Sequence, residues 1–169
     1  MKYGYVEDVT GIDFQLPEAP LFSQKYLKGE KASQPSIYIG SSVWSDKDFK
    51  GNFYPEKTPQ KNFLKEYSKQ FNTVEVNATR YGTPRASTLE TWKSSVPEGF
   101  KLCFKMPQII TQRKNLLAID VLARLEQFIL AMDSMGGKSG TTFILLQNSF
   151  NKERLPELRG FLEQLPNSQ

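Results

Sequence analysis

Between residues 37 and 165, four short apolar runs alternate with four amphipathic helical patterns, and this alternation limits the fold more than any other feature of the chain. The runs predict β-strands at 37–41, 73–77, 100–106 and 141–147. The patterns that follow them predict helices at 59–71, 84–96, 116–135 and 151–165. Because each helix must return the chain before the next strand begins, the strands are expected to be parallel, in an α/β fold.

Four βα units of this length are typical of a TIM-type (β/α)₈ barrel, of which they would make about half. A small open doubly wound sheet is the alternative, because it needs no further units. Residues 1–36 carry little periodic apolar pattern and end in the polar stretch KGEKASQPS, so they are interpreted as an N-terminal extension. Residues 37–169 are then expected to form the N-terminal half of a (β/α)₈-type barrel domain.

The composition excludes several kinds of site. The chain has no histidine, so it cannot build a Ser-His-Asp triad, a Cys-His pair or a histidine-ligated zinc site by itself, and no metal-ligand cluster is evident. Its one cysteine cannot form an internal disulfide, and no apolar run approaches the ~20 residues that span a bilayer. The N-terminus lacks the apolar core of a signal peptide, so no membrane contact and a cytoplasmic location are expected.

The net charge of +4 raises the question of a nucleic-acid partner. Lys and Arg are interspersed with Asp and Glu, and no basic block of five occurs, so the charge is interpreted mainly as a solvated surface. The composition therefore disfavours nucleic acid as a partner.

Alternate residues of a strand point to opposite faces, so each run divides into a helix-facing and an inward-facing set. The helix-facing set is apolar: Ile37, Ile39, Val74, Val76, Leu102, Phe104, Ile144 and Leu146. The inward-facing set is Tyr38, Gly40, Ser42, Glu75, Asn77, Cys103, Lys105, Leu145 and Gln147. Its polar members concentrate toward the C-terminal ends of the strands, where barrel enzymes carry their active sites.

Glu75 and Lys105 are the candidate catalytic residues, and they are expected to be close because they lie on neighbouring strands. Glu75 would transfer protons, Lys105 would stabilise an anionic or carbonyl group, and Asn77 and Gln147 would hydrogen-bond a ligand. The alternative is an ion pair and amide network that only fills the barrel interior.

Two loops supply weaker candidates. Trp44, in the loop after the first strand, could form an aromatic ligand wall or simply pack within the loop. Arg80, Tyr81 and Arg85 follow the second strand and could hold a phosphate or carboxylate, or make surface ion pairs. The stretch GGKSG follows a helix and precedes a strand, the reverse of the phosphate-loop order, and is interpreted as a turn.

Four ordered segments resemble one known family. The segments are IYIGSSVWSDKDFKGNFYP, FNTVEVNATRYGTP, PEGFKLCFKMPQIIT and FILLQNSF. Together they resemble the YecE-like family, catalogued as domain of unknown function 72, and the leading MKYGYVEDVTGIDFQLP is similar to an extension on Bacteroidetes-type members. The resemblance implies a TIM-type barrel of bacterial origin and leaves the activity open. It also implies that Ser42, Trp44, Asn77, Thr79, Tyr81 and Gln147 are signature positions, beside Glu75 and Lys105, and these six are the candidate ligand-binding residues.

The chain departs from the family pattern at three positions and in length. Gln112 stands where the family usually has a histidine, Arg80 where it has a phenylalanine, and Ser149 where it has a proline. Family members continue through four more βα units. If the missing histidine carried protons, a chain with Gln112 would be impaired.

These observations lead to one preferred function and several alternatives. The preferred one is a barrel enzyme that acts on a small anionic or sugar-like metabolite by acid/base chemistry. The alternatives are a non-catalytic or degenerate binding module and a nucleic-acid-associated barrel. No cofactor is identified, although Glu75 could share a divalent metal with carboxylates outside this chain. The strand edges of a half barrel would be exposed, so a homodimer through those edges is a further expectation.

Overall fold

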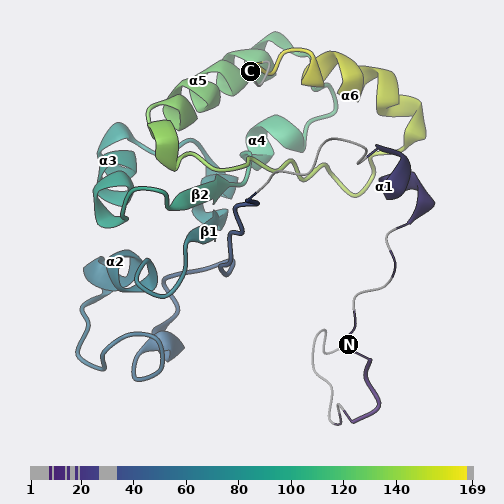
Figure 1. Ribbon diagram of the computed structural model, residues 1–169. Coiled ribbons are helices and arrows are strands. Elements are labelled where there is room, and N and C mark those ends of the chain that lie inside the picture. Colours follow the sequence, from purple (N-terminus) through teal and green to yellow (C-terminus); the bar gives the residue numbers. More distant parts are fainter. Residues whose placement is uncertain are drawn as a thin grey trace. The chain divides into compact units, whose positions relative to one another are not determined.

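The computed structural model describes residues 34–166 and, before them, Asp8, 10–13, Gln15, Glu18 and 20–26 (Figure 1). The chain divides into two compact units, Met1–Ser36 and Ile37–Gln169. In the first unit the described residues include one helix, α1, at Leu21–Tyr26. The rest of the extension expected at 1–36 lies largely outside the described residues.

Two of the predicted strands pair side by side at the centre of the second unit (Figure 1). Strand β1, Thr73–Val76, and strand β2, Lys101–Phe104, run parallel, with Thr73 opposite Lys101 and Val76 opposite Phe104. The helix α3, Ala86–Ser95, returns the chain between them. The expected α/β character and the parallel pairing of these two runs are confirmed.

The first predicted strand lies along β1 without regular strand geometry. The backbone N–H of Glu75 donates to the carbonyl of Ser41 at 3.0 Å, and that of Asn72 to the carbonyl of Ile39 at 3.3 Å. The Asn72 side chain replaces a ladder partner, because it accepts from the Ile39 N–H at 2.7 Å and donates to the Ile37 carbonyl at 2.8 Å. The prediction that Ile37 and Ile39 face the helices is wrong, since they are 70% and 65% exposed.

The fourth predicted strand also follows its neighbour only in part. Gly140 donates to the Leu102 carbonyl at 2.9 Å, and Phe143 donates to the Phe104 carbonyl at 3.0 Å. The chain then makes no further ladder with β2, so 141–147 is not a regular strand. The outer segments therefore flank the two strands in the order 37–41, β1, β2 and 139–143. Within the described residues, each of the two outer segments has a hydrogen-bonded neighbour on one side only, as an edge strand does.

The four predicted helices are present, three of them clearly shorter than their sequence patterns. Beside α3 they are α2 at Phe63–Tyr67, α5 at Ile119–Asp133 and α6 at Leu155–Leu162. A further short helix, α4 at Gln108–Thr111, has no counterpart among the predictions. Single 3₁₀ turns complete the described elements, at Lys47–Phe49, Gln60–Asn62, Asn77–Tyr81, Gly136–Lys138 and Lys152–Arg154. Pro156 lies in the first turn of α6, where its missing N–H costs no helical bond.

The core is built on one face of the two strands. Val74, Val76, Leu102 and Phe104 are at most 1% exposed, as predicted for helix-facing positions. Aromatic rings of the surrounding segments fill the space around them, among them Tyr67, Phe100, Phe128 and Phe161. The opposite face carries Glu75, Cys103 and Lys105, all half-buried. The polar residues of the strands are therefore gathered away from the core.

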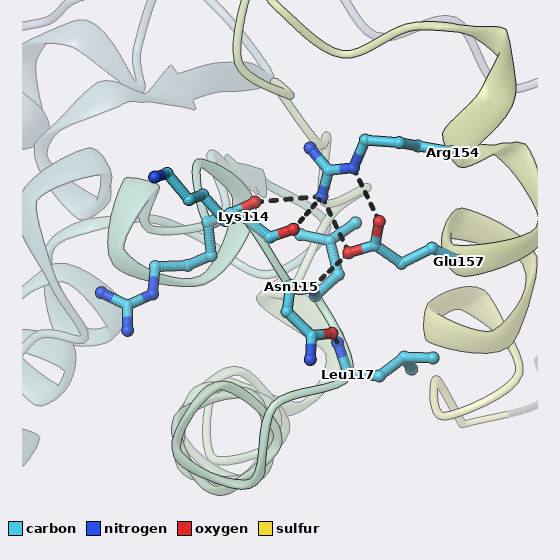
Figure 2. A network of polar contacts seen from close by, with 7 residues as sticks. Lys114, Asn115, Leu117, Arg154 and Glu157 are labelled. Carbon is cyan, nitrogen blue, oxygen red and sulfur yellow. Dashed lines mark hydrogen bonds and ion pairs between the residues drawn. The ribbon is translucent and has the colours of Figure 1, made fainter.

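A polar network ties α6 to the loop before α5 (Figure 2). Arg154 donates from Nε to Glu157 at 2.7 Å and from Nη2 to the carbonyls of Arg113 and Lys114 at 3.1 and 3.0 Å. Glu157 in turn accepts from the backbone N–H of Leu116 at 2.5 Å. The two side chains satisfy loop backbone groups as well as each other, so they hold the loop against the helix.

This network predicts a pH-dependent stability. The hydrogen bonds from Arg154, aided by the Leu116 N–H and opposed by burial, lower the pKa of Glu157 below its ordinary value of 4.5. The folded-state pKa is the lower one, so the stabilisation is complete above pH 4.5 and is lost as the pH falls through the folded-state pKa. We expect Glu157→Gln to lower the unfolding temperature by about 2–4 °C near neutral pH and by less in acid.

The measurement is thermal unfolding followed by circular dichroism across the acid range. Glu153→Gln is the matched control, because it removes an exposed carboxylate from the turn that precedes the same helix. A Glu157→Gln effect of the same size at every pH would contradict the role assigned to the carboxylate.

Candidate functional site

Glu75, Asn77 and Lys105 form a hydrogen-bonded chain at the C-terminal ends of β1 and β2. Asn77 donates from Nδ2 to Glu75 Oε1 at 2.7 Å, and Lys105 donates from Nζ to Asn77 Oδ1 at 3.3 Å. Glu75 and Lys105 were expected to pair, and the structure joins them through the amide instead. The strand register explains the arrangement, because Glu75 lies opposite Cys103 and Lys105 comes two residues later.

The charged groups here make no ion pair within the described part of the chain. Beyond its bond to Asn77, the Lys105 ammonium lies 5.3 Å from the centroid of the Phe143 ring. Arg80 contacts the Gln108 side chain at 3.4 Å and lies 5.9 Å from the centroid of the Tyr81 ring. A half-buried charge that is not neutralised by a carboxylate is a favourable place for a ligand of opposite sign.

The carboxylate opens onto a hollow of about 380 Å³ on this side of the sheet. The hollow is lined by residues of the loop after the first segment and of the turn after β1: Ser42, Val43, Trp44, Ser45, Glu75, Asn77, Ala78, Arg80 and Tyr81. Lys105 is not in its lining and reaches the site through Asn77. The hollow therefore combines a carboxylate, an amide, a guanidinium and two aromatic rings.

Packing behind the hollow positions Trp44. Its ring meets Trp92 of α3 edge to face, with centroids 5.6 Å apart. The Tyr54 hydroxyl donates to the Trp44 carbonyl at 2.7 Å, and burial raises the pKa of Tyr54, so the hydroxyl remains a donor. Tyr81 differs, since it is 77% exposed at the rim. The Trp44 ring is thus fixed by its packing, whereas the Tyr81 ring is exposed to solvent.

The remaining predicted residues have separate places. The Ser42 carbonyl accepts from Asn77 Nδ2 at 3.3 Å, which ties the first loop to the site. Thr79 is fully buried, and its hydroxyl lies 2.8 and 2.7 Å from the carbonyls of Val76 and Lys105, so it holds the two strand ends together. Gln147 lies on the fourth segment, and its side chain makes no hydrogen bond to the cluster among the described residues.

One feature of the site was not anticipated. Gln108 of α4 orients Arg80 across the mouth of the site, and a helix of four residues gives no periodic signal by which it could be found. Gln112, which is expected to stand where the family has a histidine, follows the last residue of α4. Its backbone N–H donates to the Gln108 carbonyl at 2.8 Å, and it does not line the hollow.

Other parts of the described chain offer less chemistry. A hollow of about 250 Å³ between α5 and residues 139–144 is mainly apolar, with Asp133 as its charged residue. No group of three or more His, Cys, Asp or Glu side chains in the described ranges is arranged to hold a metal ion. None of the described helices has the length and apolar character needed to cross a bilayer.

Comparison with known proteins gives consistent matches. A family model described as "Protein of unknown function DUF72" matches residues 38–169. The UPF0759 protein YecE of Escherichia coli K12 is 32% identical over 131 residues, which are 77% of this chain and 44% of that protein. The UPF0759 protein YunF of Bacillus subtilis is 37% identical over 75 residues, 44% of this chain and 26% of that protein.

Solved structures agree at the level of the fold. A DUF72 family protein from Thermotoga maritima matches with a TM-score of 0.60 at 24% identity, over 77% of this chain and 52% of that one. A DUF72 family protein from Enterococcus faecalis matches with a TM-score of 0.59 at 18% identity, over 76% and 47% of the two chains. The chain spans less than half the length of its curated relatives. The matched region and the shared fold confirm the resemblance, and the chain belongs to the DUF72 family, whose members include the UPF0759 protein YecE.

Proposed function

We propose that this chain supplies part of a site for a small anionic or sugar-like metabolite, in which Glu75 transfers protons and Lys105 stabilises negative charge. The site would lie at the C-terminal ends of the strands of a TIM-type barrel, to which this chain contributes four strand segments. The observation that carries the proposal is the Glu75–Asn77–Lys105 chain opening onto a hollow with charged groups that have no ion-pair partner among the described residues.

The contacts of the residues around the hollow support a separate chemical role for each of them. Asn77 holds one oxygen of the Glu75 carboxylate, which leaves the other oxygen to exchange a proton with a ligand hydroxyl. Arg80 can bind a phosphate or carboxylate in bidentate fashion at the mouth of the site. Trp44 and Tyr81 provide the flat apolar surfaces on which a sugar ring packs. The ligand class follows from this combination of one acid/base group, one anion site and aromatic walls.

The proposal predicts that binding and turnover respond to different residues. We expect glucose 6-phosphate or a related hexose phosphate to bind more tightly than glucose, because Arg80 and Lys105 favour the anion. Lys105→Met is expected to weaken anion binding about tenfold, which corresponds to ~1.4 kcal/mol. Glu75→Gln is expected to leave binding nearly unchanged and to lower turnover about 10²–10⁴-fold. Calorimetric titration of this chain measures binding, and a full-length DUF72 relative provides the turnover assay.

Lys65→Met is the matched control, since it removes an exposed lysine of α2 outside the site. Equal anion affinities of Lys105→Met and Lys65→Met would contradict the charge role of Lys105. Undiminished turnover with Glu75→Gln would contradict the acid/base role.

A non-catalytic binding module is the second candidate, and Gln112 in place of the family histidine favours it. It predicts anion binding by the same residues without turnover. A nucleic-acid-associated barrel predicts instead an affinity for DNA or RNA that falls steeply with salt.

A further inference from the structure

The side-chain amide of Asn77 can take only one orientation between its neighbours. The Lys105 ammonium has donors and no acceptor, so the atom that faces it at 3.3 Å is Asn77 Oδ1. The Glu75 carboxylate and the Ser42 carbonyl are acceptors, so the two N–H groups of Asn77 Nδ2 face them, at 2.7 and 3.3 Å. A flipped amide would lose all three contacts, and the orientation is therefore fixed by the surrounding groups.

These contacts use every donor of the Asn77 side chain. An amide nitrogen carries two N–H groups, and one is directed at Glu75 and the other at Ser42. Although Asn77 lines the hollow, a ligand there can accept a hydrogen bond from its amide only if one of these contacts breaks. The amide is thus placed to act on its neighbours rather than on a ligand.

Without the amide, Glu75 and Lys105 would be close enough to pair. Glu75 lies opposite Cys103, and Lys105 comes two residues later on the same face of the sheet. The spacing and rise of paired strands place their Cα atoms about 8 Å apart, a gap that two long side chains can span. The Phe143 ring, with its centroid 5.3 Å from the ammonium, is uncharged and attracts a cation less strongly than a carboxylate does.

We propose that Asn77 is a positioning residue that keeps Glu75 and Lys105 from forming an ion pair, so that both charges remain available to a ligand. The inference rests on the proposed function, in which the carboxylate transfers protons and the ammonium stabilises negative charge. A neutral amide satisfies one hydrogen bond of each group without cancelling either charge. A direct ion pair would have to break before the ammonium could bind an anion, and that cost would lower the affinity.

The ligand-free crystal structure of Asn77→Ala tests the arrangement directly. Lys105 Nζ is expected to move to within about 4 Å of a Glu75 carboxylate oxygen, the range of an ion pair. Asn77→Ser is a second variant with the same expected result, because its short side chain cannot reach both groups. If Glu75 and Lys105 stay as far apart in these variants as in the natural chain, the proposal is overturned.

Calorimetric titration with glucose 6-phosphate measures the consequence for binding. Asn77→Ala is expected to weaken binding about tenfold, as Lys105→Met does, because Glu75 then competes for the ammonium. Adding Glu75→Gln to Asn77→Ala removes that competitor and is expected to restore the affinity to within about twofold of the natural chain. A loss of affinity that Glu75→Gln does not restore would overturn the proposal, since Asn77 would then bind the ligand itself or only hold the loop.

Asn62→Ala is the matched control and is expected to leave the affinity unchanged. Asn62 is exposed and precedes α2 without making a side-chain capping bond to it. If the natural chain does not bind glucose 6-phosphate, the proposed function fails. The crystal structure of Asn77→Ala then decides by itself whether Asn77 separates the two charges.

Discussion

Gly40→Ala is expected to destabilise the second unit by about 3 kcal/mol, because the added Cβ would meet the backbone of the neighbouring strand. That atom would lie 1.9 Å from the Thr73 carbonyl oxygen, 2.7 Å from its carbon and 2.9 Å from the Tyr67 hydroxyl. A backbone atom of a paired strand cannot rotate away as a flexible side chain can. Segment 37–41 would have to leave β1 and lose the bonds that Ser41 and Ile39 accept.

The same displacement would reach the site, since the Ser42 carbonyl accepts from Asn77. Gly40→Ala is therefore expected to weaken anion binding together with stability, as measured by denaturant unfolding and titration with hexose phosphate. Gly137→Ala is the matched control, because nothing lies within 4 Å of the Cβ that it would add. Equal stabilities of the two variants would show that the first segment does not approach β1 this closely.

Lys138→Met is expected to cost about 2–3 kcal/mol, because it leaves two carbonyls at the end of α3 without their donor. The residue is only 8% exposed, and its ammonium donates to the carbonyls of Lys93 and Val96 at 2.9 and 2.8 Å. Methionine preserves the length and apolar contacts of the stem, so the loss reports the hydrogen bonds. Denaturant unfolding of the variant measures it.

Substitution of Glu98 distinguishes the contribution of the Lys138 hydrogen bonds to stability from that of its ion pair. Its carboxylate lies 3.1 Å from the Lys138 ammonium, with a side chain 90% exposed. Exposed partners of this kind contribute little, so Glu98→Gln is expected to change stability by less than about 0.5 kcal/mol. If Glu98→Gln lowered stability strongly and Lys138→Met only weakly, the ion pair and not the hydrogen bonds would be the stabilising interaction.

The sequence was most informative where an element is surrounded by others. Val74, Val76, Leu102 and Phe104 alternate with polar residues, and that alternation predicted both the strands and their buried face. The segment at 37–41 has an equally strong apolar pattern, yet it does not form a regular strand beside β1, because the Asn72 side chain takes the place of a ladder partner. The apolar pattern carries no information on which groups of the neighbouring strand form the ladder.

The site shows a different limit of sequence reasoning. Strand order brought Glu75 and Lys105 into one region, but the pairing register decided that Asn77, not Glu75, meets the lysine. A shift of register is invisible in a list of alternating residues. Thr79 illustrates the same point, since its signature position was read as ligand binding and the structure uses its hydroxyl between two strand ends.

The contact of the Lys105 ammonium with the Phe143 ring links the candidate site to the fourth segment. Phe143 is held against β2 through both of its backbone groups, by Phe104 and Met106. An anion bound at the Lys105 ammonium would share that cation with the ring, so the proposed anion site and the anchor of segment 139–143 depend on the same side chain.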